Sequence, residues 1–289
     1  MAERTNYSKP YLGQLETGKR AVLPQHVAAY ERALGVDLDR IAFAASAPRR
    51  VDGASLASLA TILSSTRRLE DVVGVGGVLD TVRGVHQLSQ VLAREARAAL
   101  EAPAVRLASE ISQYRGWLEL AAGDQSRAAR CLGTAVELAR QADDPDRLAH
   151  GLSFTAYSAL EAGRVKDAAA LIDEALRDGR VHPLIRMYDR YQLARVHAAA
   201  GESYAAQRAL IVADKAAEEA VAEEPPDAGY WYTDGLWGLY RGRVLWLLGQ
   251  QNSARQEVQA GLAAMPREHR EAGWAAKWVR AVQGGDVPH

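Results

Sequence analysis

A recurring set of polar and aromatic residues is the first feature of this sequence that could do chemistry. The set is defined by four glycines, each followed by a polar residue: Gly123, Gly163, Gly201 and Gly249. Six, about ten and about thirteen residues before these glycines stand three rows: Trp117, Tyr157, Arg195 and Arg243; Gln113, Ser153, Tyr191 and Leu239; and Glu110, His150, Asp189 and Leu236. If the rows share one face, an arginine could grip a carboxylate while amides, acids and aromatic rings hold a small molecule or a peptide. Solvated residues with internal ion pairs are the alternative.

The N-terminal segment is the second candidate site. Residues 1–50 hold eight Lys/Arg against five Asp/Glu, while the whole chain has a net charge of −1. This local excess of three positive charges is a weak sign of an anionic partner for that segment. Ser8 is a favourable N-cap, Pro10 is tolerated in a first helical turn, and Gly18 would end this short helix. A second helix follows Pro24, with Val27, Tyr30 and Leu34 on one face.

The remaining reactive residue types form no specific pattern. The seven histidines show no metal-ligand spacing, and Cys131, the only cysteine, lies among apolar residues as an inert core thiol would. The loop around Gly76 imitates a nucleotide-binding loop but has Leu79 where the third glycine belongs, and it reads as a hinge. No catalytic residue, metal site or cofactor is therefore predicted, and a non-enzymatic role is favoured, although the question stays open.

Tryptophan is concentrated at the C-terminal end. Five of the six tryptophans lie from residue 230 onward, together with three tyrosines: Trp231, Trp237, Trp246, Trp274, Trp278, Tyr230, Tyr232 and Tyr240. Large side chains that close the last part of the fold are the simpler interpretation. An aromatic ligand pocket or a dimer face is the alternative.

The elements that position these residues are helices in pairs. The four glycines are 40, 38 and 48 residues apart, which indicates internal repeats. Small residues stand seven before, five after and twelve after each glycine, and an apolar residue stands nine after it: Gly116, Ala156, Ala194, Gly242; Ala128, Ala168, Ala206, Ala254; Ala135, Ala175, Ala213, Gly261; and Leu132, Ile172, Leu210, Val258. Small side chains allow two helix backbones to approach, and glycine ends the first helix in a left-handed conformation.

We therefore expect an all-α protein. Helix pairs are predicted at 106–142, 146–178, 184–221 and 230–264, with a capping helix at 268–282. Two earlier helices are predicted near 54–73, from Leu56, Leu59, Leu63 and Leu69, and near 77–100, from Val78, Val82, Val85, Leu88, Val91 and Leu92. The predicted domains are an N-terminal segment at 1–45, a linker at 46–53 and a helical repeat domain at 54–289.

The register of the repeats resembles the tetratricopeptide repeat family over about 106–265. It lacks most aromatic positions of that family, and its helices are somewhat longer than those of the 34-residue consensus repeat. The resemblance implies a superhelix whose first helices line a concave face. The ligand-binding candidates on that face are Gln113, Trp117, His150, Tyr157, Asp189, Tyr191, Arg195 and Arg243.

The N-terminal segment resembles the back half of the lambda-repressor/Cro-like (XRE) helix-turn-helix family, through Ser8, Tyr11-Leu12, Leu15-Glu16, Gly18, Pro24 and Leu34-Gly35-Val36. The resemblance implies that Ser8–Leu15 is the recognition helix, with Leu12 and Leu15 in the core. The residues implied to meet DNA are Ser8, Lys9, Pro10, Tyr11 and Gln14 in the major groove, and Lys19 and Arg20 at phosphate.

The segment departs from that family at its start. The family has two preceding helices, and Met1 falls within the second, so the domain is expected to be partial. In the family, Glu16 usually pairs with an arginine on the absent helix. A start further upstream, a shortened chain or a loss of DNA binding would each explain this, and an unrelated helical cap is the alternative.

These features favour a bacterial transcription regulator, or a DNA-binding-deficient relic of one, that senses a small molecule or peptide in the concave groove. The predicted partners are a ligand in the groove, DNA as a candidate and a second copy of the chain. No membrane partner is expected. A scaffold that captures a protein partner without binding DNA is one alternative, and an enzyme recruited from a regulator and using the aromatic C-terminal pocket is another. The lone cysteine, the absence of an apolar run of about 18 residues and the polar N-terminus predict a cytoplasmic protein.

Overall fold

The computed structural model describes residues 2–35, 37–220 and 222–283, and throughout these ranges the ordered elements are helices. The N-terminal elements are α1 (Ala2–Thr5), α2 (Lys9–Glu16), α3 (Pro24–Leu34) and α4 (Leu38–Ser46). The prediction of an all-α fold is confirmed. Val36, the end of the third predicted pair at 221 and the last residues, 284–289, lie outside the described residues, as do the side chains of Leu34 and Leu38.

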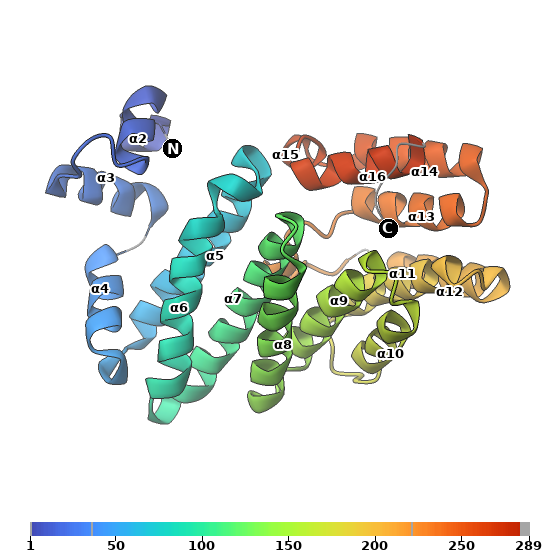
Figure 1. Ribbon diagram of the computed structural model, residues 1–289, viewed down its shortest axis with the longest axis horizontal. Coiled ribbons are helices and arrows are strands. Elements are labelled where there is room, and N and C mark those ends of the chain that lie inside the picture. Colours follow the sequence, from blue (N-terminus) through green and yellow to red (C-terminus); the bar gives the residue numbers. More distant parts are fainter. Residues whose placement is uncertain (1, 36, 221, 284–289) are drawn as a thin grey trace.

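The rest of the chain is a succession of antiparallel helices (Figure 1). It comprises α5 (Gly53–Val73), α6 (Leu79–Glu95), α7 (Glu101–Ala121), α8 (Gln125–Gln141), α9 (Pro145–Glu161), α10 (Val165–Ala175), α11 (Pro183–Ala199), α12 (Ser203–Glu219), α13 (Asp234–Leu247), α14 (Gln251–Ala264), α15 (Arg267–Arg270) and α16 (Gly273–Gln283). Short 3-10 turns stand at Pro48–Arg50, Val75–Gly77, Ala98–Leu100 and Asp227–Gly229. Helices α7 to α14 form four hairpins at the places that the repeat register predicts.

The register works as close packing requires. Gly123, Gly163, Gly201 and Gly249 have φ between 74° and 88°, which places each just past the end of a first helix in the left-handed conformation. All the small and apolar register positions are buried. A Cβ added at Gly116 would lie 2.6 Å from Cγ of Leu132, so position −7 of one helix faces position +9 of the next.

Two predicted helix faces need correction. Leu69 is 44% exposed, because the inner face of α5 turns from Leu56, Leu59 and Leu63 to polar residues in its last turns. On α3 the buried face consists of His26, Ala29 and Ala33, whereas Val27 and Tyr30 are only half-buried. Helix α4 was not predicted as a separate element; its Ala44 packs with Val51 and Leu56 in the core that α5 shares with α6 and α7.

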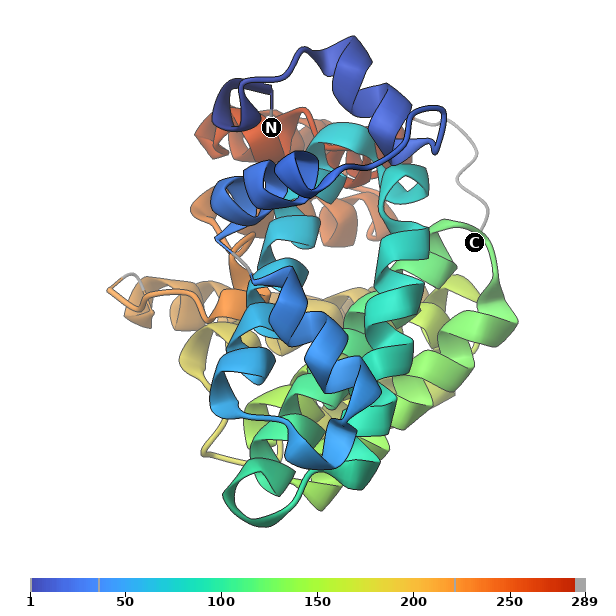
Figure 2. The same cartoon turned by 90° about the vertical axis from the view of Figure 1, so that its left-hand side faces the viewer.

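The array closes on itself. The segment before α13 and the helices α15 and α16 return to the end of α5, so that residues about 160–200 positions apart meet. Figure 1 shows α15 beside the upper end of α5, and the view turned by 90° places the N-terminal helices over this same end (Figure 2). The predicted capping helix therefore packs on α13 and α14 and also contacts the first helix of the array.

A pair of glycine substitutions tests the register. Gly116→Ala is expected to lower the free energy of unfolding by about 1–3 kcal/mol, because the new methyl group would overlap the fully buried Leu132. Gly133→Ala on α8 is the control: its Cβ would meet nothing within 4 Å, so better helix propensity should raise stability by about 0.5–1 kcal/mol. Urea unfolding measures both. Equal effects of the two variants would contradict the close approach of α7 and α8.

Candidate functional site

The N-terminal segment forms a helix-turn-helix. Asn6, between α1 and α2, has a φ of 59°, a left-handed conformation that asparagine tolerates better than most residues. Ser8 caps α2 by accepting a hydrogen bond from the backbone N–H of Tyr11 at 3.4 Å. Leu12 and Leu15 are buried, as the resemblance implied.

The candidate DNA contacts are accessible to solvent to different extents. Ser8, Lys9, Pro10, Gln14, Lys19 and Arg20 are exposed, and Tyr11 is half-buried. Arg20 donates from Nε to Oε1 of Gln14 at 3.2 Å, and its guanidinium carbon lies 4.4 Å from the centre of the Tyr11 ring. The loop after α2 thus folds back on the exposed side of that helix and brings the cation of Arg20 to it.

His26 holds α2 against α3, a role that the sequence did not reveal. Its Nδ1 accepts from the backbone N–H of Leu23 at 3.0 Å, so the neutral ring carries its proton on Nε2, which lies 2.9 Å from the hydroxyl of Tyr11. Tyr7 stacks on Tyr11 with ring centres 5.0 Å apart. Glu16, for which an arginine partner was expected, instead accepts from the hydroxyl of Tyr30 at 2.6 Å.

The second site is a cavity on the inner face of the array. It is lined by residues from α5, α7, α9, α11, α13, α16 and the segment before α13: Arg67, Glu70, Asp71, Gln113, Tyr114, Trp117, His150, Phe154, Tyr157, Tyr188, Ala228, Tyr230, Trp231, Leu236, Tyr240, Trp274 and Trp278. Its volume is about 80 Å³, several times the roughly 10–15 Å³ that one water requires. Two hollows of about 170 and 330 Å³ share parts of its wall.

Two carboxylates of α5 hold the aromatic wall in place. Glu70 accepts from the hydroxyl of Tyr114 at 2.8 Å and from Nε1 of Trp117 at 3.0 Å. Asp71 accepts from the hydroxyl of Tyr230 at 2.7 Å and from Nε1 of Trp274 at 3.0 Å. Burial raises the pKa of Glu70 above its usual value, against the lowering effect of these two donors. Through its hydrogen bond with Trp274, Asp71 ties α5 to α16.

A buried charge network lies beside these carboxylates. Glu110 accepts from Nη1 of Arg67 at 2.6 Å and from Nη2 of Arg147 at 2.7 Å. Burial alone would raise the pKa of Glu110, but the two guanidinium groups outweigh it and hold this pKa below its usual value. Burial, and next the charge of Arg67, lower the pKa of His150 to about 3, so its imidazole is neutral near pH 7.

The sequence-predicted ligand residues divide into two groups. Gln113, Trp117, His150 and Tyr157 line the cavity. Asp189, Tyr191, Arg195 and Arg243 do not line it. Tyr188, one residue before Asp189, takes the lining place on α11.

The four remaining residues make other contacts. Asp189 is buried against Ser153, and Tyr191 donates to Asp214 at 2.9 Å. Arg195 lies behind the wall, over the rings of Tyr157 and Trp278, and pairs with Glu161 at 2.5 Å. Arg243 donates to the carbonyl of Ala281 at 3.1 Å.

Sequence reasoning missed the charged groups of the cavity. Arg67, Glu70 and Asp71 belong to α5, which precedes the repeats and lacks their register. The only sequence signal for them was that the leucine pattern of this helix ends where these polar residues begin. In the structure, Arg67 and Glu70 are buried on the inner side of α5.

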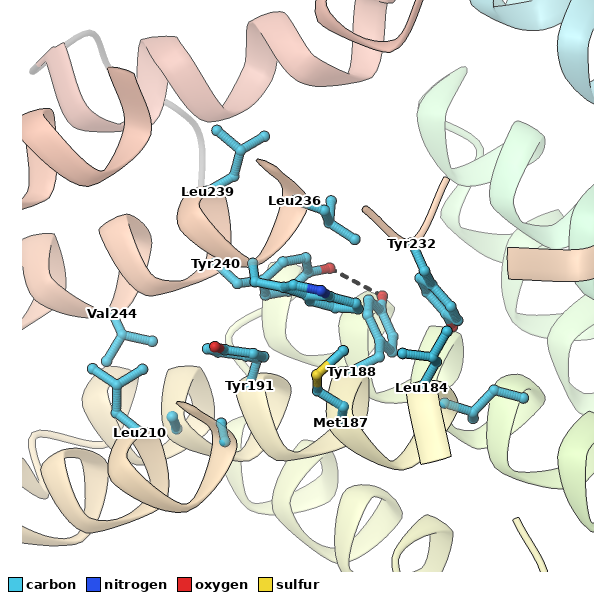
Figure 3. Packing of buried hydrophobic residues seen from close by; sticks show 14 of the residues in the cluster. Leu184, Met187, Tyr188, Tyr191, Leu210, Tyr232, Leu236, Leu239, Tyr240 and Val244 are labelled. Carbon is cyan, nitrogen blue, oxygen red and sulfur yellow. Dashed lines mark hydrogen bonds between the residues drawn. The ribbon is translucent and has the colours of Figure 1, made fainter. Parts of the chain in front are cut away.

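The residues of the tryptophan-rich C-terminal segment divide between the core and the cavity wall. Tyr232 and Trp237 are core residues, packed with Tyr188, Tyr191, Leu236 and Tyr240; the hydroxyls of Tyr188 and Tyr240 lie 3.0 Å apart (Figure 3). Trp231, Trp274 and Trp278 instead line the cavity. Large side chains therefore close the last turn of the array and also form a ring-lined hollow.

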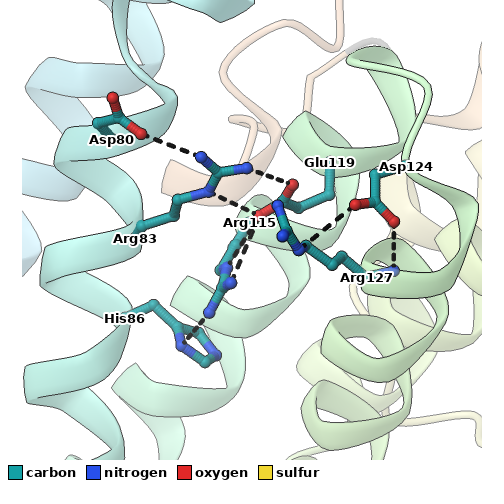
Figure 4. Close-up of polar contacts among 7 residues, drawn as sticks. All are labelled: Asp80, Arg83, His86, Arg115, Glu119, Asp124 and Arg127. Carbon is teal, nitrogen blue, oxygen red and sulfur yellow. Dashed lines mark hydrogen bonds and ion pairs between the residues drawn. The ribbon is translucent and has the colours of Figure 1, made fainter.

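A separate polar cluster lies between α6, α7 and α8. Glu119, whose side chain is fully buried, accepts from Arg83 at 2.9 Å and from Arg115 at 3.3 Å, and Arg115 also contacts His86 (Figure 4). Burial, and then the charge of Arg115, lower the pKa of His86 to about 4. Each carboxylate there is matched by an arginine, so this cluster reads as a structural link between helices. Among the described residues no group of three or more metal-ligating side chains occurs.

Comparison with known proteins places the N-terminal segment. The helix-turn-helix family matches residues 1–41, which span α1 to α3 and the start of α4. This family comprises DNA-binding transcription regulators, and the match supports the expected helix-turn-helix. No curated protein matches the chain. No helix within the described ranges is both long and apolar enough to cross a bilayer.

Proposed function

We propose that this protein is a ligand-responsive transcription regulator. Residues 1–45 would read DNA through α2, and residues 54–289 would sense a small molecule in the cavity. A second copy of the chain would complete the DNA-binding unit, since helix-turn-helix proteins commonly bind two half-sites as dimers.

The observation that carries the proposal is the position of α5. Its last turns supply Arg67, Glu70 and Asp71 to the cavity, and the same helix contacts both α3 and α4 of the N-terminal segment. Arg40 of α4 also pairs with Asp52, the N-cap of α5, at 2.7 Å. One helix therefore contacts both the cavity and the N-terminal segment. A ligand that shifts α5 would shift α3 and α4, and with α3 the helix α2 that His26 holds against it.

Asp71 is the part of α5 best placed to report ligand binding. Its two oxygens hold Tyr230 and Trp274, both of which line the cavity. A ligand that reorients either ring would change how tightly the end of α5 is held by the C-terminal helices. A ligand that favoured a second arrangement of α5 would meet the requirement for a population shift.

A DNA-binding measurement tests the proposal. Fluorescence anisotropy on DNA upstream of this gene and its neighbours should show salt-sensitive binding by the purified chain. The Lys19→Ala/Arg20→Ala double variant should bind more weakly, and the slope of log K against log salt should fall by about one for each lost phosphate contact.

Lys166→Ala provides the matched control, because Lys166 is an exposed cation on α10, remote from α2. It should leave both affinity and salt slope unchanged. If the wild-type chain binds no upstream DNA even at low salt, or if all three proteins bind alike, the DNA-binding part of the proposal fails. Light scattering of the chain and of its DNA complex measures whether a dimer forms.

A further inference from the structure

The cavity contains one cation whose hydrogen-bonding capacity is not used. Arg67 lines the cavity, and its side chain is 5% exposed. Nη1 is occupied by Glu110, and the guanidinium lies over the ring of Tyr114 at 5.2 Å. Within the described part of the chain, however, buried Nη2 has no hydrogen-bond partner. A buried guanidinium N–H without an acceptor is costly unless something else supplies one.

His150 adds a second unused group on the same wall. It is 5% exposed, lines the cavity, and its Nε2 has no partner among the described residues. The carboxylates of the cavity, in contrast, have partners: each oxygen of Glu70 and Asp71 accepts a hydrogen bond from an aromatic side chain. The unpartnered Nη2 of Arg67 can only donate and therefore demands an acceptor. The Nε2 of a neutral His150 can donate or accept, and each carboxylate oxygen keeps a second lone pair, so a cationic ligand is the alternative that the probes below test.

The rest of the wall is suited to a flat ring. Trp117 lies edge-on to Phe154 with centres 5.9 Å apart, and Trp231 lies edge-on to Phe154 at 6.2 Å and to Tyr188 at 5.4 Å. Rings fixed in this way present faces and edges to a planar guest. A cavity of about 150 Å³ holds one benzene ring. At about 80 Å³ this cavity is smaller, so a one-ring guest would also occupy part of the adjoining hollow of about 330 Å³.

We infer that the cavity binds a small planar aromatic molecule carrying a carbonyl or carboxylate oxygen, which accepts a hydrogen bond from Nη2 of Arg67. Ligand binding is inferred from the cavity alone. Only the effect of the ligand on DNA binding rests on the proposed function. Arg67 replaces Arg195 and Arg243 as the ligand-gripping arginine, since neither of them lines the cavity.

Four one-ring probes test the inference with the full chain. Benzamide and benzoate carry the acceptor, toluene lacks it, and benzylamine replaces it by a cation. Because Trp117, Trp231, Trp274 and Trp278 line the cavity, tryptophan fluorescence follows binding, with calorimetry as a second readout. Benzamide and benzoate should saturate, and toluene and benzylamine should bind at least about tenfold more weakly, as expected for one hydrogen bond to a charged group.

Arg67→Lys is the decisive variant. Lysine keeps the positive charge beside Glu110 but loses the second guanidinium nitrogen, so benzamide and benzoate should bind about 10- to 150-fold more weakly. Arg68→Lys, at the exposed next position of α5, is the matched control and should bind like the wild type. Thermal unfolding of both variants shows that the fold is intact.

The outcomes separate the two proposals. Benzylamine binding as tightly as benzamide, no saturable binding by either carbonyl probe, or an unchanged affinity in Arg67→Lys would each overturn the inference. Probe binding that depends on Arg67 upholds it, even if the probes leave DNA affinity unchanged. In that last case the coupling through α5 is what fails.

Discussion

Replacing Glu161 with alanine is expected to lower the free energy of unfolding by about 3–5 kcal/mol, the usual cost of leaving a buried charge without its partner. Glu161 accepts from Nη2 of Arg195 and from Nζ of Lys277, both at 2.5 Å. The side chain of Arg195 is 7% exposed and is enclosed by the rings of Tyr157 and Trp278. Without the carboxylate, Arg195 keeps its charge in that enclosed position.

The same substitution should weaken the closure of the array. Lys277 belongs to α16 and Glu161 to α9, so their pair joins the C-terminal helix to the middle of the inner face. Urea unfolding measures the loss, and hydrogen exchange should show α16 opening more often than in the wild type. Glu95→Ala is the control, because its partner Arg49 is 73% exposed; such pairs contribute little. A loss no greater than in that control would contradict the buried network.

The stability contributed by Glu161 should also depend on pH. Burial raises its pKa, but the charges of Arg195 and Lys277 outweigh burial and hold it below the usual value. A carboxyl whose pKa is lowered by folding stabilises the protein above the unfolded-state pKa of about 4.3 and loses this contribution as the pH falls further. The difference between wild type and Glu161→Ala should therefore shrink below about pH 4.

The helical hairpins could be predicted because they depend on local sequence. Helix ends follow from residues such as Gly123 and Gly163, which adopt left-handed φ values, and close approach follows from small residues in register. Neither requires knowledge of distant parts of the chain. Helix α2 was predictable for the same reason, since Ser8, Leu12 and Leu15 define its cap and its buried face within eight residues.

The cavity could be predicted only in part, because it depends on closure. Counting from the repeat glycines identified Trp117, His150 and Tyr157, which face inward from the first helices of hairpins. It could not place Arg67 and Asp71, which meet the C-terminal rings only because the C-terminal segment returns to the end of α5. It also could not show that Arg195 forms an ion pair with Glu161, since that contact depends on how α9 and α11 of successive hairpins are placed.

Asp189→Asn is expected to stabilise the protein near pH 7, an uncommon result for a substitution in a core. Asp189 is fully buried, and burial raises its pKa well above the usual value, against the lowering effect of the hydrogen bond with Ser153. The hydroxyl of Ser153 has one proton and lies within hydrogen-bonding reach of both Asp189 and the carbonyl of Ala149, the latter at 2.8 Å. When that proton goes to Ala149, it is not available to Asp189. The contact between Ser153 and Asp189 is then best made by a protonated carboxyl that donates to the serine oxygen, and an amide can donate in its place.

The effect should grow with pH. Because folding raises the pKa of Asp189, the folded chain holds a proton that the unfolded chain releases above about pH 3.9. Each pH unit between that value and the folded-state pKa therefore costs about 1.4 kcal/mol of stability, and asparagine removes this cost. Urea unfolding from pH 5 to pH 8 should show the variant gaining on the wild type as the pH rises. Asp173→Asn, at an exposed position on α10, should show no such trend. A variant that is less stable than the wild type by the same amount at every pH would mean that Asp189 is ionised in the folded protein. A cation would then have to balance its charge from within reach of the second carboxylate oxygen. That oxygen has no partner among the described residues.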